Sequence, residues 1–119
     1  MTKVATLILP LPPSINSYFA TFKGRRIISK AGREFKKFLA DYCLVTRVPK
    51  FGSSRLSMCL CIHPRDRRIN DLSNRIKALE DALVQAGVMD DDSQIDFLQV
   101  QRGEIKKGGE CVVMLKEIG

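Results

Sequence analysis

The 119-residue sequence predicts an α/β fold of the two-layer α+β kind, in which a small mixed sheet of about four strands carries two helices against one face. Two observations indicate this class. Short strand-like runs alternate with longer segments whose apolar residues recur at helical spacing, in the order β-α-β-α-β-β. Hydrophobic residues make up 45% of the chain, and no repeat or linker divides it, so we expect one compact domain over residues 1–119.

The chain begins with an expected strand from Val4 to Leu9, which the proline-rich residues 10–13 stop. We expect a loop from there to Tyr18. Residues 22–28 then alternate basic and apolar side chains around Gly24. This pattern predicts an exposed, hairpin-like excursion that carries positive charge.

Ser29 predicts the N-cap of a first helix, since an apolar stripe at helical spacing follows over residues 33–45. The stripe consists of Phe35, Phe38, Leu39 and Tyr42. Residues 49–54 predict a turn. A second strand is expected from Leu56 to Ile62, where apolar residues alternate until Pro64.

A second, strongly amphipathic helix is expected from Asp71 to about Gln85, with Gly87 ending it. Its apolar face would consist of Leu72, Ile76, Leu79 and Leu83, and its polar face of Asp71, Asn74, Lys77 and Asp81. Two further strands are expected over residues 95–100 and 111–115, joined by a turn at residues 106–109.

The charge balance of the chain favours an anionic polymer as its partner. There are 20 Lys and Arg residues against 13 Asp and Glu, which gives a formal net charge of +7. No segment approaches the roughly 20 apolar residues that cross a bilayer, and the start of the chain lacks a signal-peptide pattern. We therefore expect no membrane partner and a cytoplasmic location.

Carboxylates and lysine are the groups left for chemistry. The four cysteines lack a CxxC pair or a nearby histidine cluster, so reduced core thiols are expected. His63, the single histidine, stands beside Pro64 and is expected to be a loop residue rather than a ligand or a base.

The stretch Asp71-Leu72-Ser73-Asn74, followed by Lys77 and later by Asp90-Asp91-Asp92, predicts a metal site. Mg²⁺ prefers oxygen ligands, and Asp71, Asp91 and Asp92 would supply them. Grouped carboxylates repel one another unless a cation binds. Lys77 would stabilise charge on a phosphate, and Asn74 would orient it. The ordinary alternative is a helix N-terminus at Asp71 and a solvated turn at residues 90–93.

Five pieces of the sequence, taken in order, resemble the RusA family of Holliday junction resolvases. They are Leu9-Pro10-Leu11-Pro12-Pro13-Ser14-Ile15-Asn16, Arg67-Arg68-Ile69-Asn70-Asp71, Lys77-Ala78-Leu79-Glu80-Asp81-Ala82-Leu83, Ala86-Gly87 and Asp91-Asp92-Ser93-Gln94-Ile95. The resemblance implies a small, homodimeric, Mg²⁺-dependent crossover junction endodeoxyribonuclease, often encoded by prophages, with Mn²⁺ as an alternative ion. It implies roles in DNA recombination and repair. It also implies that Asp71, Lys77 and Asp92 are essential, with Asp91 beside them in the metal site.

Ser73 departs from the family pattern, which reads Asp-x-Asp-Asn where this chain has Asp71-Leu72-Ser73-Asn74. Three alternatives follow. Ser73 contributes a neutral hydroxyl to the metal site, or Glu80 approaches the vacant position from two helical turns away, across a rise of about 10 Å. In the third, the protein binds junctions without cutting them. Retention of the other acidic residues and of Lys77 favours the first.

Positively charged residues on both sides of the motif are expected to contact DNA phosphates, which gives salt-dependent binding. They are Lys23, Arg25, Arg26, Lys30, Arg65, Arg67 and Arg68. Asn16, Asn70 and Arg68 are candidates for contacts to base edges. A dimer would place two like cuts across a four-way junction. RNA binding is disfavoured, because the chain has no Trp and just two Tyr for stacking.

Overall fold

A computed structural model describes residues 2–68 and 71–118 of the chain. Its main sheet has four strands in the order β1-β6-β4-β5. They are β1 (Val4–Leu9), β4 (Leu56–His63), β5 (Ile95–Arg102) and β6 (Glu110–Glu117). β4 pairs antiparallel with β6 and parallel with β5, so the sheet is mixed, as the sequence predicts.

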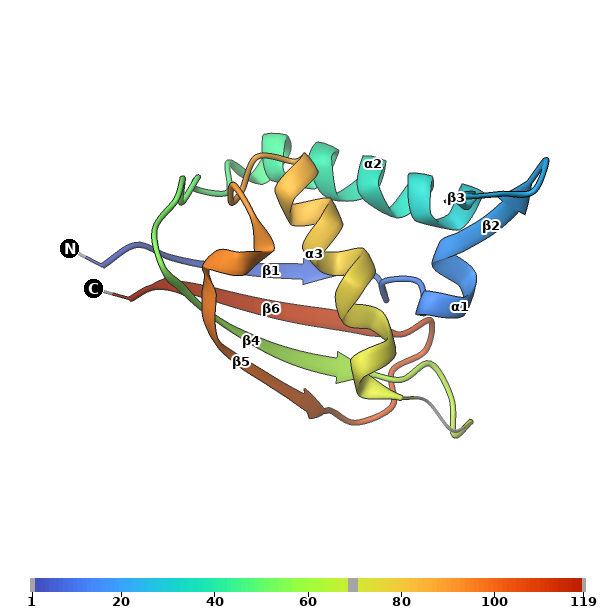
Figure 1. Cartoon of the computed structure of the whole chain (residues 1–119). Helices are drawn as coiled ribbons and strands as arrows, with labels where there is room; N and C mark the ends of the chain where they lie inside the picture. The colour runs from blue at the N-terminus through green and yellow to red at the C-terminus, as the bar shows by residue number, and fades with distance from the viewer. Residues whose placement is uncertain (1, 69–70, 119) are drawn as a thin grey trace.

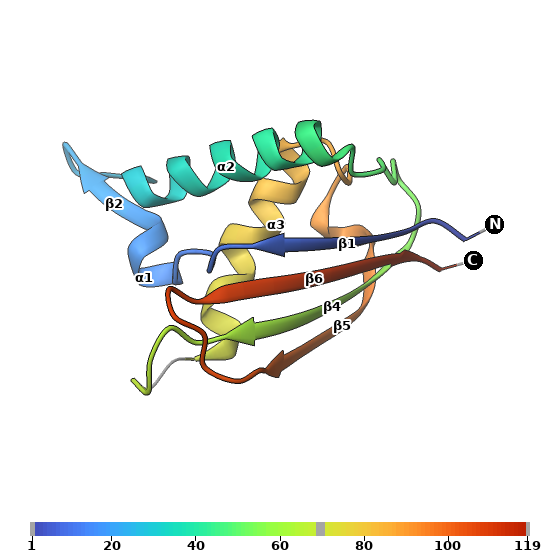
Figure 2. The same ribbon diagram turned by 180° about the vertical axis from the view of Figure 1, so that it is seen from behind.

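The helices α2 (Lys30–Thr46) and α3 (Ile76–Gln85) pack on one face of this sheet (Figure 1). Seen from behind, the sheet lies in front of α3, and no helix of the described chain covers its other face (Figure 2). A short helix, α1 (Ile15–Tyr18), precedes a hairpin of β2 (Phe19–Phe22) and β3 (Arg25–Ile28). The predicted two-layer α/β class is confirmed, with the hairpin and α1 as additions.

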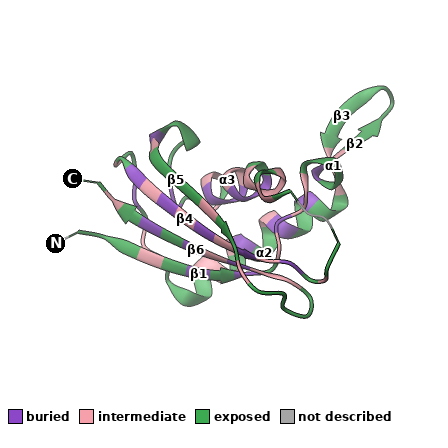
Figure 3. Ribbon diagram, turned by 90° about the horizontal axis from the view of Figure 1, so that it is seen from below, coloured by how far each residue is buried: buried purple, intermediate pink, exposed green. Residues whose placement is uncertain are grey.

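The core lies between the sheet and the two long helices. Alternate residues of β4, from Leu56 to Ile62, are buried, because successive strand side chains point to opposite faces (Figure 3). Leu79 and Leu83 of α3 pack against the same cluster, fully buried. The predicted apolar stripe of α3 is therefore its core face.

The residues that cap the two long helices are those that the sequence predicts. The Ser29 hydroxyl accepts a hydrogen bond from Gly32 N at 3.1 Å and caps α2 as predicted. Gly87 has a φ of +77° and directly follows Ala86, the C-cap of α3, where a left-handed residue closes a helix.

Two local predictions need correction. The expected loop through Asn16 to Tyr18 is helical in α1, because the fully buried Tyr18 ring draws this segment onto the core. The second helix does not begin at Asp71 as an α-helix. It begins as a 3-10 helix (Leu72–Arg75), and α3 starts at Ile76. Arg75, at the junction, has φ −107° and ψ −4°, which is wide of α-helical geometry.

The hairpin of β2 and β3 projects from the body of the molecule and is largely exposed (Figure 3). Its two-residue turn consists of Lys23 and Gly24, with φ of 52° and 74°. Positive φ at both central residues is the geometry that matches the twist of paired strands. The expected excursion over residues 22–28 is thus a true hairpin.

The two ends of the described chain meet at the opposite end of the sheet from the hairpin (Figures 1 and 2). Glu117 N donates to Lys3 O at 3.0 Å, and Lys3 N donates to the Glu117 carboxylate at 3.1 Å. None of the described helices is long and apolar enough to cross a membrane.

Candidate active site

Asp71 stands at the N-cap of the 3-10 helix that leads into α3, and its side chain is exposed. Its backbone oxygen accepts a hydrogen bond from Asn74 N at 3.3 Å. Among the described residues, however, its carboxylate makes no capping hydrogen bond. Asp71 thus stands at a helix N-terminus, as the ordinary alternative expects, but without the side-chain hydrogen bond of a cap. Ser73, in the same 3-10 helix, is also exposed.

Lys77 lies in the first turn of α3 and is held by Asp81, one turn further on. Its Nζ donates to Asp81 Oδ1 at 3.0 Å, while the Tyr18 hydroxyl donates to Asp81 Oδ2 at 2.8 Å. The hydrogen bond to Asp81, and then the negative charges of Asp81, Asp92 and Glu80, raise the pKa of Lys77. Lys77 is therefore a fixed, protonated cation at neutral pH.

The acidic turn after α3 forms a short 3-10 helix (Asp92–Gln94) in which Asp91 is the N-cap. The Asp91 carboxylate accepts a hydrogen bond from Ser93 N at 2.9 Å. Bonds from the Ser93 side chain and backbone lower the pKa of Asp91, so this group stays ionised. Residues 90–93 are exposed, as the alternative of a solvated turn expects, and they also form this ordered cap.

Gln94 anchors the acidic turn from inside the protein. Its Oε1 accepts hydrogen bonds from the backbone N–H groups of Asp90 and Asp91, both at 2.9 Å. Its Nε2 donates to Gly52 O at 2.9 Å and to Ser54 O at 2.7 Å. Gln94 is 4% exposed, so these bonds form where water does not compete, and they fix Asp91 and Asp92 in place.

A pocket of about 380 Å³ brings Lys77, Asp91 and Asp92 together. Asp81 and Lys36 also contribute to its wall, together with Val84 and Gln85. Asp71, Ser73 and Asn74 are not among the lining residues, because they precede α3. The structure thus unites three of the four predicted catalytic residues in one pocket.

Glu80 lies close to this pocket and is half-buried on α3. Burial raises the pKa of Glu80, and the negative charge of Asp92 raises it further, while Lys77 opposes both effects. Such mutual repulsion between carboxylates is what a bound cation would relieve. Glu80 therefore adds to the negative potential around Asp92.

The donors in the pocket suit a hard divalent cation that keeps several waters. Mg²⁺ is commonly held by one or two carboxylates, with water and substrate phosphate completing its shell. Asp92 and the second oxygen of Asp91 meet that need. Within residues 2–68 and 71–118, no three His, Cys, Asp or Glu side chains form a group that could hold a metal ion. Recruitment of Asp71 and Ser73 to the same ion stays a prediction.

Comparison with known proteins identifies the family of this chain. The sequence model described as "Endodeoxyribonuclease RusA" matches residues 10–116. The chain belongs to the RusA endodeoxyribonuclease family.

Curated RusA proteins resemble the chain over nearly its whole length. The "Crossover junction endodeoxyribonuclease rusA" of Enterobacteria phage HK97 is 32% identical over 93% of this chain and 92% of the relative. The protein of the same name from Enterobacteria phage 82 is 32% identical over 95% and 94%, respectively. That of Shigella sonnei (strain Ss046) is 32% identical over 96% and 95%.

The basic residues predicted for DNA contact gather at one end of this RusA-family chain, where the hairpin, α1 and the loop after β4 lie (Figure 1). Those on or next to the hairpin are Lys23, Arg25, Arg26 and Lys30, and those after β4 are Arg65, Arg67 and Arg68. All seven are exposed. The Arg26 guanidinium lies 3.8 Å from the Phe19 ring centroid, which helps to order this arm. Asn16 is exposed in α1, and Asn70 lies outside the described residues.

The sequence interpretation missed several polar residues that shape the RusA-family site. Gln94 has a local signal, since Asp91-x-x-Gln94 has the spacing of a capping box. Lys36 has none, because it reaches the pocket from the other long helix. Arg102 joins Arg67 and Arg68 around a hollow of about 430 Å³ only through the sheet pairing of β5.

Proposed function

We propose that this protein is a divalent-metal-dependent endonuclease that cuts four-way (Holliday) DNA junctions in recombination and repair, encoded by a phage or prophage and acting in the cytoplasm. One observation carries the proposal. A chain of the RusA endodeoxyribonuclease family holds Lys77, Asp91 and Asp92 in one pocket. The basic end of the molecule supports a DNA substrate. Residues 1–119 would act as one RusA-like domain.

Each residue of the pocket has a role in this proposal. Mg²⁺ or Mn²⁺, when bound, activates water for attack on the phosphodiester. Asp92 and Asp91 would hold the ion, with Asp71 and the Ser73 hydroxyl approaching it from the start of the 3-10 helix. Lys77, kept protonated by Asp81, would neutralise charge that develops on the phosphate oxygens. Asn74 would orient the phosphate.

Cleavage of a labelled four-way junction tests the function. We expect the natural chain to cut the junction with Mg²⁺ or Mn²⁺, and to leave a linear duplex of the same sequence intact. The second candidate, a junction-binding protein that does not cut, is favoured by the serine at position 73. It predicts binding without cleavage by the natural chain and cleavage by Ser73→Asp. Failure of both proteins to bind the junction would contradict both candidates.

The uncovered face of the sheet supports the homodimer in this proposal. Cys59 and Cys61 alternate with the core residues of β4, so they point away from the helices. Their partners on β6 are Met114 and Val112, and Val112 pairs with Ile8 of β1. Further residues of this face are Val4 and Phe97. The face also carries the polar residues Ser57, Gln99 and Lys116, and its exposed apolar side chains are of the kind that an interface between subunits covers.

Charge substitutions on two exposed apolar positions test this interface. We expect Met114→Lys to dissociate the dimer, because a buried ammonium would lose its water without gaining a partner. Leu44→Lys, on the exposed side of α2, is the matched control and should leave the dimer intact. Light scattering after size-exclusion chromatography measures the mass. Dissociation by Leu44→Lys alone would place the interface on α2 instead.

A further inference from the structure

A cavity of about 490 Å³ opens beside α1, between the proline-rich loop of residues 10–14 and α2. The residues of α2 that line it are Ala31, Glu34, Phe35 and Phe38, which share one helix face. Lys36, which lines the active-site pocket, lies on a different face. The cavity is therefore distinct from the pocket of Lys77 and Asp92.

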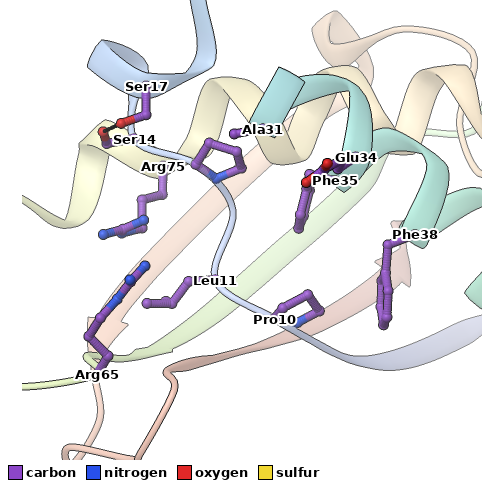
Figure 4. A pocket seen from close by; sticks show the side chains of 11 residues that line it. Pro10, Leu11, Ser14, Ser17, Ala31, Glu34, Phe35, Phe38, Arg65 and Arg75 are labelled. Carbon is purple, nitrogen blue, oxygen red and sulfur yellow. Dashed lines mark hydrogen bonds between the residues drawn. The ribbon is translucent and has the colours of Figure 1, made fainter. Parts of the chain in front are cut away.

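Two arginines from different segments point into this cavity (Figure 4). Arg75 Nη1 donates to Pro12 O at 2.6 Å, which fixes the half-buried guanidinium against the proline-rich loop. Burial and then the like charge of Arg65 lower the pKa of Arg75, so the two cations lie close enough to repel each other. Both cations would attract a bound anion.

Two hydroxyl groups, those of Ser14 and Ser17, also line the cavity. Ser14 Oγ donates to Ser17 Oγ at 3.4 Å, and both side chains line the same cavity as Arg75. Of the described residues that line the cavity, only Glu34 is acidic. Its carboxylate lies 3.8 Å from Lys30 Nζ on the same helix and, in Figure 4, away from the arginine pair. Guanidinium and hydroxyl donors around one space favour a tetrahedral oxyanion.

We propose that this cavity binds one backbone phosphate of the DNA substrate, held by Arg65 and Arg75 together with the hydroxyls of Ser14 and Ser17. The inference rests on the proposed function for the identity of the ligand. The cavity is lined by Ser14 and Ser17, next to the hairpin that carries Arg25 and Arg26, and by Arg65 of the loop after β4, so one DNA strand can follow all three. Pro10 and Phe38 provide an apolar wall for the neighbouring deoxyribose.

Salt titration of junction binding, measured without divalent metal, tests the phosphate site. Each phosphate that a protein neutralises contributes about 0.9 to the slope of log K against log salt concentration. We expect Arg65→Ala and Arg75→Gln each to weaken binding about 3- to 10-fold and to reduce the slope by about one. Arg75→Lys keeps the charge and should keep the slope. Lys50→Ala, in the loop between α2 and β4, is the matched control and should change neither quantity.

Junctions that carry one uncharged methylphosphonate at successive positions identify the bound phosphate. At one position we expect the replacement to weaken binding of the natural chain but not of Arg65→Ala, because the same contact is already lost. Thermal unfolding of each variant reports whether it folds. A slope that both arginine variants leave unchanged would overturn the phosphate site, even if the natural chain cuts junctions. If inorganic phosphate alone stabilises the natural chain against thermal unfolding, and no methylphosphonate position in the junction changes binding, the assignment of the site to DNA would be overturned.

Discussion

Asp92→Asn is expected to lower the rate of junction cleavage by about 10²- to 10³-fold, the range seen when one group that stabilises the transition state is removed. Asp92 lines the pocket with Lys77, and its charge raises the pKa of both Lys77 and Glu80. An amide keeps the shape of the side chain but cannot offer an ionised oxygen to a cation. Single-turnover cleavage at saturating metal measures the rate.

Asp90→Asn is the matched control for this substitution. It makes the same change of charge in the same turn, but Asp90 is not among the residues that line the pocket. Its backbone N–H, which donates to Gln94, is unaffected. We expect Asp90→Asn to cut like the natural chain and both variants to bind the junction. Equal loss of cleavage in the two variants would show that net charge, rather than the position of Asp92, controls the rate.

Leu79→Ala is expected to lower the free energy of unfolding by about 3 kcal/mol and the melting temperature by about 10 °C. Leu79 is fully buried where α3 faces the sheet, and truncation leaves a cavity that its neighbours cannot fill. The same packing sets the position of Lys77 and Asp81 on the opposite side of α3. Thermal and urea unfolding measure the loss.

Leu44 provides the same substitution at an exposed site. Its side chain is 78% exposed on α2, so Leu44→Ala should change stability by no more than about 0.5 kcal/mol. Equal destabilisation by the two substitutions would contradict the placement of α3 against the core.

Local patterns in the sequence predict most of the elements, because each depends on neighbouring residues. The Ser29 cap, the alternation of β4 and the closing Gly87 all lie where the sequence predicts them. The sheet order does not follow from local pattern. β4 lies between β5 and β6, although β5 and β6 are consecutive in the chain, because strand pairing depends on contacts between distant residues.

The sequence likewise predicts one part of the candidate site but not the other. The acidic residues and Lys77 stand out in the sequence because their charge is unusual on or near an amphipathic helix. The residues that hold these side chains in place are harder to predict from the sequence. Gln94 links the backbone of Asp91 to that of Gly52, 42 positions away, and the Tyr18 hydroxyl donates to the carboxylate of Asp81 across 63 positions. Arg75 reaches Pro12 across 63 positions. Such contacts arise only when the fold brings the segments together.

The adjacency of Lys3 and Glu117 has a practical consequence for how the chain can be rearranged. A short glycine-rich linker would span the two ends, so a circularly permuted chain with new termini elsewhere should keep the β1–β6 pairing. For the same reason, a protein fused at either end would sit at the far end of the sheet from the basic hairpin. Immobilisation through that end would leave the basic end of the molecule turned toward solution.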